Sequence, residues 1–217
     1  TKILATLPLF MKLEEEGKVD INDSLYQHLP KLSKTNKASI DFKHMLSHYA
    51  GLKSWIPFYL ETLKDLDKYY KDIPDFNYST QVAENMYVRN DFRDSIYNKI
   101  YESELSSDLE YKYSDLPFYI IQQIIERYEN ETLDQLIVDK FYSKMGINMM
   151  RYHPIKEFDR KNIVPTENDT LWRKQLLKGY VHDQGVALLG GVGGHAGLFA
   201  NANAVAKFMQ MFLNKGI

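Results

Sequence analysis

The tripeptide Tyr113-Ser114-Asp115 has the residue types best suited to acid–base chemistry in this sequence. It comes just before a strongly amphipathic stretch, and a tyrosine at such a turn can present its hydroxyl group to a cleft. A nearby lysine would lower the pKa of that hydroxyl and let it act as a base. In the other interpretation Tyr113 is a packing residue and Asp115 caps the next helix. Because the sequence has 16 tyrosines, the tripeptide alone favours the structural interpretation.

Histidines supply two further candidate groups. His44 and His48 are four residues apart, and on a helix they would share a face that could hold a metal ion. No glutamate separates them in the metalloprotease pattern and no third ligand is evident, so capping and core packing are favoured. His182-Asp183 and His195 could form an acid–base pair, although a histidine beside glycines is more often a hydrogen-bonded structural residue.

The segment 191–196 (GVGGHA) matches the loose dinucleotide-binding pattern G-x-G-x-x-A. That pattern requires a preceding strand, a helix directly after it, and an acidic residue about 20 positions further on. The apolar run 186–189 before it is short, and the chain ends before the acidic residue is due. Close approach of the backbone to a neighbouring element is therefore the expected role of these glycines.

Helices are the elements expected to position these residues. The clearest begins after Asp115, where one apolar stripe is formed by Leu116, Ile120, Ile121, Ile124, Ile125 and Tyr128. Other helices are expected at 3–16, where Pro8 implies a kink or a late start, at 41–48 before Gly51, at 133–144, and from a cap at Asn203 to Gly216. Three surface helices are expected within 54–110, with Ser79 and Asn90 as N-caps. Residues 151–181 look irregular, and alternating strand patterns are scarce, so the chain is all-α or the helical part of a mixed fold.

Composition limits the function classes. Hydrophobic residues form 44% of the 217 residues, enough for a substantial core, and the net charge of −2 argues against a nucleic-acid binder. The absence of cysteine excludes disulfides, thiolate metal sites and a cysteine nucleophile. No apolar run approaches the roughly 20 residues of a transmembrane helix. The chain starts at Thr1 without a signal peptide, which we interpret as a piece of something longer.

Several ordered segments resemble the β-lactamase-related serine hydrolases, which include penicillin-binding proteins, class C β-lactamases and esterases. The resemblance spans nearly the whole chain. It is carried by segments 13–23 (LEEEGKVDIND), 39–52 (SIDFKHMLSHYAGL), 113–116 (YSDL), 163–167 (IVPTE), 181–183 (VHD), 190–199 (GGVGGHAGLF) and 208–216 (FMQMFLNKG).

The resemblance implies which residues carry the chemistry. Family members attack an acyl group with the serine of a Ser-x-x-Lys motif, and the tyrosine of a second motif relays protons. By this resemblance Lys2 is the motif lysine, its serine lies two residues before Thr1, and Tyr113 and Asp115 form the second motif. Asp115 replaces the commoner asparagine and adds a negative charge. Lys2 and Tyr113 are therefore expected to approach within roughly 8 Å of each other.

The resemblance also implies the architecture. Residues 1–217 would form a single incomplete β-lactamase-like domain, truncated at both ends. It would be a mostly α fragment of an α/β (α+β) β-lactamase/transpeptidase-like fold, with the helical lobe present and most of the antiparallel sheet missing. His195 is expected to bond to protein groups, with the loop 190–197 buried against the first helix.

The expected function is acyl transfer. The substrate would be a small acyl compound (a β-lactam, a D-Ala-D-Ala peptide or an ester), without cofactor, metal ion or nucleic acid. Some relatives are fused to glycoside hydrolases, which suggests such a fusion in the parent protein and a cell-wall role in the periplasm or envelope. The 217 residues alone are expected to be inactive because they contain no Ser-x-x-Lys. The alternative is a non-catalytic module that binds peptidoglycan or protein and keeps the fold.

Overall fold

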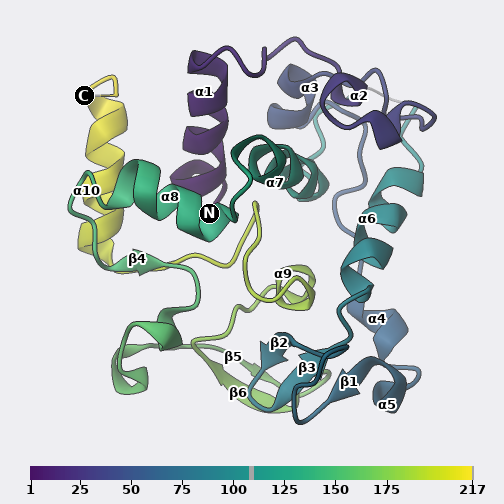
Figure 1. Cartoon of the computed structure of the whole chain (residues 1–217), viewed down its shortest axis with the longest axis vertical. Coiled ribbons are helices and arrows are strands. Elements are labelled where there is room, and N and C mark those ends of the chain that lie inside the picture. The colour runs from purple at the N-terminus through teal and green to yellow at the C-terminus, as the bar shows by residue number, and fades with distance from the viewer. Residues whose placement is uncertain (108–109, 217) are drawn as a thin grey trace.

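Helices dominate the computed structural model, which describes residues 1–107 and 110–216 (Figure 1). The longer helices are α1 (Leu7–Glu15), α6 (Phe92–Glu102), α7 (Leu116–Glu129) and α10 (Ala202–Leu213). The short helices are α2 (Leu25–His28), α3 (Phe42–Leu46), α4 (Tyr59–Thr62), α5 (Leu66–Tyr69), α8 (Leu133–Ile137) and α9 (Gln184–Leu188). Wide π-helical turns are η1 (Lys2–Thr6) and η3 (Val138–Tyr142), and 3₁₀ turns are η2 (Pro30–Leu32), η4 (Pro154–Lys156) and η5 (Arg160–Asn162).

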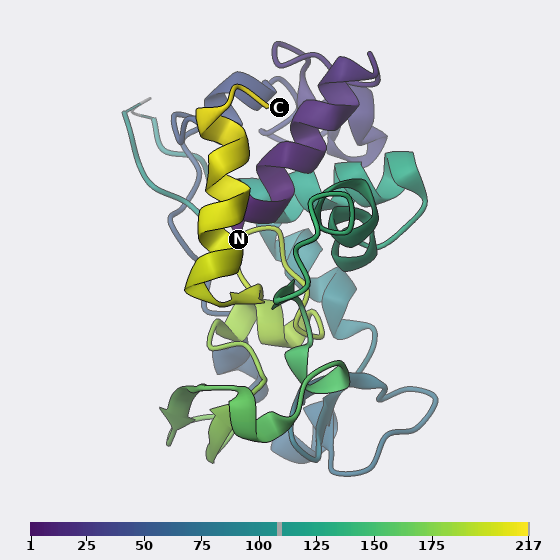
Figure 2. The same cartoon turned by 90° about the vertical axis from the view of Figure 1, so that its left-hand side faces the viewer.

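Three small antiparallel sheets complete the fold. The strands are β1 (Tyr70–Lys71), β2 (Thr80–Ala83), β3 (Met86–Val88), β4 (Met150–Arg151), β5 (Pro165–Asp169), β6 (Gln175–Lys178) and β7 (Phe199–Ala200). One sheet has the order β1-β3-β2, and β4 pairs with β7 and β5 with β6. Figures 1 and 2 show α1, α7, α8 and α10 gathered in one half of the molecule and the sheets β1–β3 and β5–β6 in the other, with α9 between them.

The first helix begins as the sequence predicts, with an irregularity before Pro8. The turn η1 is π-helical, with the amide of Leu7 bonded to the carbonyl of Lys2. Pro8 has no N–H to donate to the carbonyl of Leu4, the usual acceptor four residues back. The hydroxyl of the buried Tyr142 donates to that carbonyl instead, at 2.8 Å. A side chain from η3 thus replaces the missing backbone donor and ties the start of the chain to the neighbouring helix.

Helix α7 forms the centre of the helical half. The predicted apolar stripe is buried, with Leu116, Ile120, Ile121, Ile124 and Ile125 at 0% exposure, whereas Tyr128 at the last turn is 38% exposed. Asp115 occupies the N-cap position, as predicted, but its side chain makes no capping hydrogen bond. The carboxylate is therefore available for another partner.

Two other predicted helix ends differ in detail. The cap of α10 is Asn201, not Asn203, and its side chain accepts from the amide of Ala204. Asp41 caps helix α3 as predicted, but the helix ends at Leu46, and His48 is left-handed (φ 62°) as well as Gly51.

The small sheets are where the sequence prediction was wrong. Residues 54–110 contain α4, α5 and α6 as expected but also the sheet β1-β3-β2, and the supposedly irregular region 151–181 contains the β5–β6 hairpin. Ser79 precedes a strand and caps no helix. Asn90 accepts from the amide of Ser79 at 3.0 Å, which holds the entry to β2. These strands are two to five residues long, too short to show an alternating pattern.

A buried ion network anchors the β5–β6 hairpin. The guanidinium of Arg173 is fully buried and donates to the carboxylates of Asp169 at 2.8 Å and Glu167 at 3.1 Å. It also donates to the carbonyl of Val181 at 2.7 Å. Burial alone would raise the pKa of Asp169, but the hydrogen bond from Arg173 and nearby amides lowers it overall. The network fixes the hairpin to the segment that leads into α9.

Candidate active site

Lys2 projects from η1 toward the start of α7. Its ammonium lies 2.6 Å from Asp115 Oδ1 and 5.0 Å from the centre of the Tyr113 ring. It also lies 3.5 Å from the carbonyl oxygen of His195. The expected approach of Lys2 and Tyr113 is therefore present in the structure.

Electrostatics favour a charged lysine at this position. Burial by itself would lower the pKa of Lys2, but the interactions with Asp115 and Tyr113 outweigh it and raise the pKa above its ordinary value. Lys2 is thus protonated in the resting site. In that form its ammonium donates hydrogen bonds and stabilises negative charge nearby.

The loop that carries Tyr113 is anchored by its neighbours. Ser114 is buried and donates to the carbonyl of Lys53 at 2.6 Å, and its hydroxyl accepts from the amide of Leu116. Tyr113 itself is 51% exposed and lines a pocket together with Lys2. The structural interpretation from the sequence, a packing tyrosine followed by a capping aspartate, holds only in part: the Tyr113 ring packs on a histidine, but Asp115 makes no capping hydrogen bond.

His48 supports the same loop, a role that the sequence did not reveal. Its Nδ1 accepts from the amide of Ser114 at 3.3 Å, and its ring packs against that of Tyr113 with centroids 4.6 Å apart. Burial, and then the charge of Lys2, lowers the pKa of His48, so the ring is neutral. His44 instead faces Asp41, its Nδ1 2.6 Å from Oδ1. The two histidines therefore serve packing and capping, as the sequence favoured.

A second acid–imidazole pair lies behind Lys2. His195 is buried, its Nε2 lies 3.3 Å from Asp183 Oδ1, and its ring stacks on Tyr119 with centroids 4.4 Å apart. Asp183 also caps α9 by accepting from the amide of Val186. The expectation that His195 bonds to protein groups holds for Nε2, whereas Nδ1 is buried without a hydrogen-bond partner among the described residues. The pair fixes the backbone carbonyl that faces Lys2.

The glycine-rich loop 190–197 packs against η1 and α7, as expected. Thr6 donates from its hydroxyl to the carbonyl of Gly194 at 2.6 Å, and the amide of Gly194 donates to Gln122 at 2.9 Å. A Cβ on Gly194 would lie 2.2 Å from the carbonyl oxygen of Phe118. Because residues 184–188 form helix α9 in place of the strand that a dinucleotide site needs, the fingerprint interpretation is not supported.

One set of donors in the described residues has the spacing of a cation site. Ligand atoms of Asp115, Asp183 and His195 all lie within 4.8 Å of one another. Asp115 is already paired with the ammonium of Lys2 at 2.6 Å, so a metal ion would have to displace that lysine. These donors therefore suit the ammonium of Lys2 better than a metal ion.

Several of these residues line a pocket of 620 Å³. Lys2, His48, Tyr113 and His195 supply polar groups to its lining, next to the ring of Phe118. Its apolar walls come from η1, α1 and α10, through Ile3, Leu4, Leu7, Val205 and Met209. The volume lies within the range of small-molecule sites. A lysine and a tyrosine hydroxyl in one pocket suit proton transfer at an acyl group.

Comparison with known proteins decides the family. The family described as Beta-lactamase matches residues 1–217. The chain belongs to the β-lactamase family. This confirms the resemblance found in the sequence.

Two relatives of this chain are named as an amidase and a carboxypeptidase. An N-acetylmuramyl-L-alanine amidase of Bacillus subtilis is 27% identical over 236 residues, which cover 100% of this chain and 49% of that protein. A Salmonella typhimurium protein named provisionally as a D-alanyl-D-alanine carboxypeptidase is 28% identical over 242 residues, covering 100% and 50%. The chain thus spans about half the length of the curated relatives it matches.

A solved structure supports the β-lactamase/transpeptidase-like fold. A protein from Bacteroides dorei, described as a β-lactamase, superposes with a TM-score of 0.61 at 15% identity, covering 100% of this chain and 49% of that one. Within the described residues no helix combines the length and apolar character needed to cross a bilayer.

Proposed function

We propose that the protein containing this chain is a serine hydrolase that forms a covalent acyl-enzyme on a β-lactam, a D-Ala-D-Ala peptide or an ester during cell-wall metabolism. The observation that carries this proposal is the presence of Lys2 and Tyr113 in one pocket, with Asp115 paired to the Lys2 ammonium. The names of the relatives, an amidase and a carboxypeptidase, favour amide-bond substrates.

In the proposed chemistry a serine two residues before Thr1 is the nucleophile. Lys2 is charged at rest, so it first gives up one proton to solvent, and the neutral amine is the base. The serine oxygen then bonds to the acyl carbon as its proton passes to the Lys2 amine. The bond to the leaving group breaks as that group takes the proton from Lys2 by way of the Tyr113 hydroxyl. Water then releases the acyl group by the reverse route.

Asp115 and His195 act on Lys2 in this proposal. The carboxylate of Asp115 holds the ammonium in the pocket, and the carbonyl of His195 gives it a second acceptor. The Asp183–His195 pair is therefore a positioning pair, since it acts through the backbone of the loop. A cell-envelope location, and a fusion to a glycoside hydrolase, belong to the same proposal.

Covalent labelling tests the proposal. A fluorescent penicillin should label the full-length protein on the serine that precedes Lys2, whereas residues 1–217 alone should stay unlabelled. A stoichiometric label on a serine within the 217 residues, such as Ser47 or Ser114, would refute this placement of the nucleophile. A full-length protein that binds peptidoglycan but is never acylated would instead support a non-catalytic binding module.

A further inference from the structure

A second pocket lies in the sheet half of the molecule, apart from the residues of the candidate active site. Its volume is 310 Å³. Its walls come from β2, β3, η4, the segment after β6, α9 and the start of the glycine-rich loop. None of its lining residues is acidic. This pocket plays no part in the proposed acyl transfer.

Two glycines let the walls of this pocket approach each other closely. Gly191 has φ 96°, and a Cβ there would lie 2.9 Å from the ring of His153. Gly179 has φ 82°, and a Cβ there would lie 2.0 Å from Ile155. His153 itself is left-handed, with φ 47°, a conformation that is uncommon for residues other than glycine. Strain of this kind is concentrated at ligand sites.

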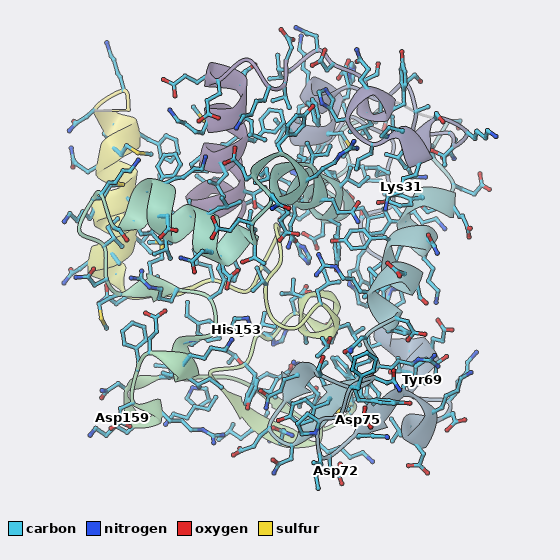
Figure 3. All side chains as sticks on the ribbon, viewed as in Figure 1. Lys31, Tyr69, Asp72, Asp75, His153 and Asp159 are labelled. Carbon is cyan, nitrogen blue, oxygen red and sulfur yellow. The ribbon has the colours of Figure 1, made fainter. Side chains whose placement is uncertain are left out.

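Several polar groups of the pocket have unused hydrogen-bonding capacity. In the described part of the chain, no hydrogen bond involves the imidazole of His153, the hydroxyl of Tyr87 or the ammonium of Lys156. The hydroxyl of Tyr180 accepts from Gln81 Nε2 at 3.1 Å, which leaves its own proton to donate. Burial, and then the charge of Lys156, lowers the pKa of His153, so its ring offers one donor and one acceptor. Figure 3 places His153 between α8 and the β5–β6 hairpin.

The chemistry of the lining indicates the class of ligand. Mixed donors and acceptors beside the rings of Tyr87, Tyr180 and Phe199 match a sugar, whose hydroxyl groups bond in both senses and whose ring packs on aromatic faces. A volume at the lower end of ligand-site sizes suits one sugar ring better than a disaccharide or a peptide. Lys156 adds a positive charge and would favour a sugar that carries a carboxylate.

We propose that this pocket, formed around His153, Tyr180 and Lys156, binds a single N-acetylated hexose unit of peptidoglycan, with preference for the carboxylate-bearing one. The choice of peptidoglycan sugars rests on the proposed cell-wall function. Gly190 and Gly191 line this pocket, and His195 of the same loop lines the candidate active site. An occupied sugar pocket would thus sit at one end of the loop whose other end faces Lys2.

Saturation-transfer NMR on the full-length protein tests the pocket directly. N-acetylmuramic acid and N-acetylglucosamine serve as probes, and for ligands of this size we expect dissociation constants on the order of millimolar. N-acetylmuramic acid should bind more tightly. Lys156→Gln should remove that difference and leave N-acetylglucosamine binding unchanged, whereas Lys144→Gln, outside the pocket, should change neither.

Two variants probe the neutral contacts. His153→Asn keeps a residue that tolerates the left-handed backbone, and Tyr180→Phe removes only a hydroxyl group. Each should weaken binding of both sugars by about fivefold, the effect of one lost hydrogen bond. Tyr26→Phe, at an exposed tyrosine outside the pocket, is the control.

The outcomes separate this inference from the proposed function. No saturation transfer to either sugar, or equal transfer in the His153→Asn and Tyr180→Phe variants, would overturn the sugar site. Penicillin labelling should be the same in these variants as in the unaltered protein. If the protein is never acylated, the serine hydrolase proposal fails while the sugar measurement still decides the pocket.

Discussion

The two halves of this molecule are held together in different ways. In the helical half, side chains join segments far apart in the chain: Lys2 meets Asp115, and Thr6 meets Gly194. In the sheet half, contacts between distant segments occur too, but one hairpin also holds the fully buried Arg173–Asp169 ion pair. The helical half therefore places the reactive groups in a partly exposed site, whereas the sheet half contains a buried charge pair and a second pocket. Substitution of Lys2 or Asp115 should affect activity, whereas substitution of Arg173 should affect stability.

The largest expected effect is on activity, from Lys2→Ala in the full-length protein. Removing the ammonium should slow penicillin acylation by about 10²- to 10⁴-fold, the usual contribution of a positioned acid–base group. The rate is measured by labelling with a fluorescent penicillin and quenching samples at a series of times. Lys12→Ala on α1, where the lysine pairs with Glu15 on the surface, should leave the rate unchanged. An acylation rate that survives loss of Lys2 would remove this lysine from the mechanism.

The next effect is on stability, from Arg173→Met. Because the guanidinium is fully buried, this change leaves Asp169 without its partner, and we expect a loss of about 3–5 kcal/mol of unfolding free energy. The folded-state pKa of Asp169 is lowered, so its contribution is present above the unfolded pKa and is lost as pH falls through the folded one. Urea unfolding at several pH values should show the variant deficit shrinking in acid. Arg93→Met, at a surface pair with Glu126, should cost under about 1 kcal/mol.

A smaller effect tests the seam between η1 and the glycine-rich loop. Thr6→Val keeps the shape of the side chain but leaves the buried carbonyl of Gly194 without the hydroxyl donor. We expect a loss of about 1–3 kcal/mol, measured by urea unfolding. Thr35→Val removes two local bonds, one to the carbonyl of Leu32 and one from the amide of Lys37, and should cost less. Equal losses would mean that the long-range bond has no special weight.

The smallest effect concerns the pH dependence of acylation. Asp115 raises the pKa of Lys2, and rate-limiting deprotonation of Lys2 would make acylation increase with pH. Asp115→Asn removes that charge, so the acidic limb of the profile should move to lower pH. A pH profile of penicillin labelling measures the shift, with Asp139→Asn on η3 as the control. A shift to higher pH would contradict the assignment.

The sequence predicted the helical half better than the sheet half because its signals there are long. The apolar stripe after Asp115 covers about three turns, and the Lys2–Tyr113 approach followed from motifs that the resemblance matched in order. The support that His48 gives to the Tyr113 loop could not be found in this way. Residue 48 has a left-handed backbone and its ring bonds to the amide of Ser114, and neither fact is shown by the sequence.

The sheet half had no comparable signal. Strands of two to five residues are too short to show an alternating pattern of apolar and polar residues. In the sequence Arg173 resembles any surface arginine, and only the folded hairpin shows that it is buried. The sequence indicated that His195 is a structural residue, but it offered Asp183 only as a candidate partner. Asp183 comes twelve residues earlier, and the fold alone brings the two together.

The contact between Tyr142 and the carbonyl of Leu4 makes two distant positions dependent on each other. The Tyr142 hydroxyl replaces the backbone donor that Pro8 lacks. Its contribution to the free energy of unfolding therefore depends on a proline at position 8. In a double-mutant cycle, Tyr142→Phe should be costly beside Pro8 and nearly neutral beside alanine. Neither change alone would reveal the dependence. The order in which such substitutions arise would therefore decide whether the lineage passes through a destabilised intermediate.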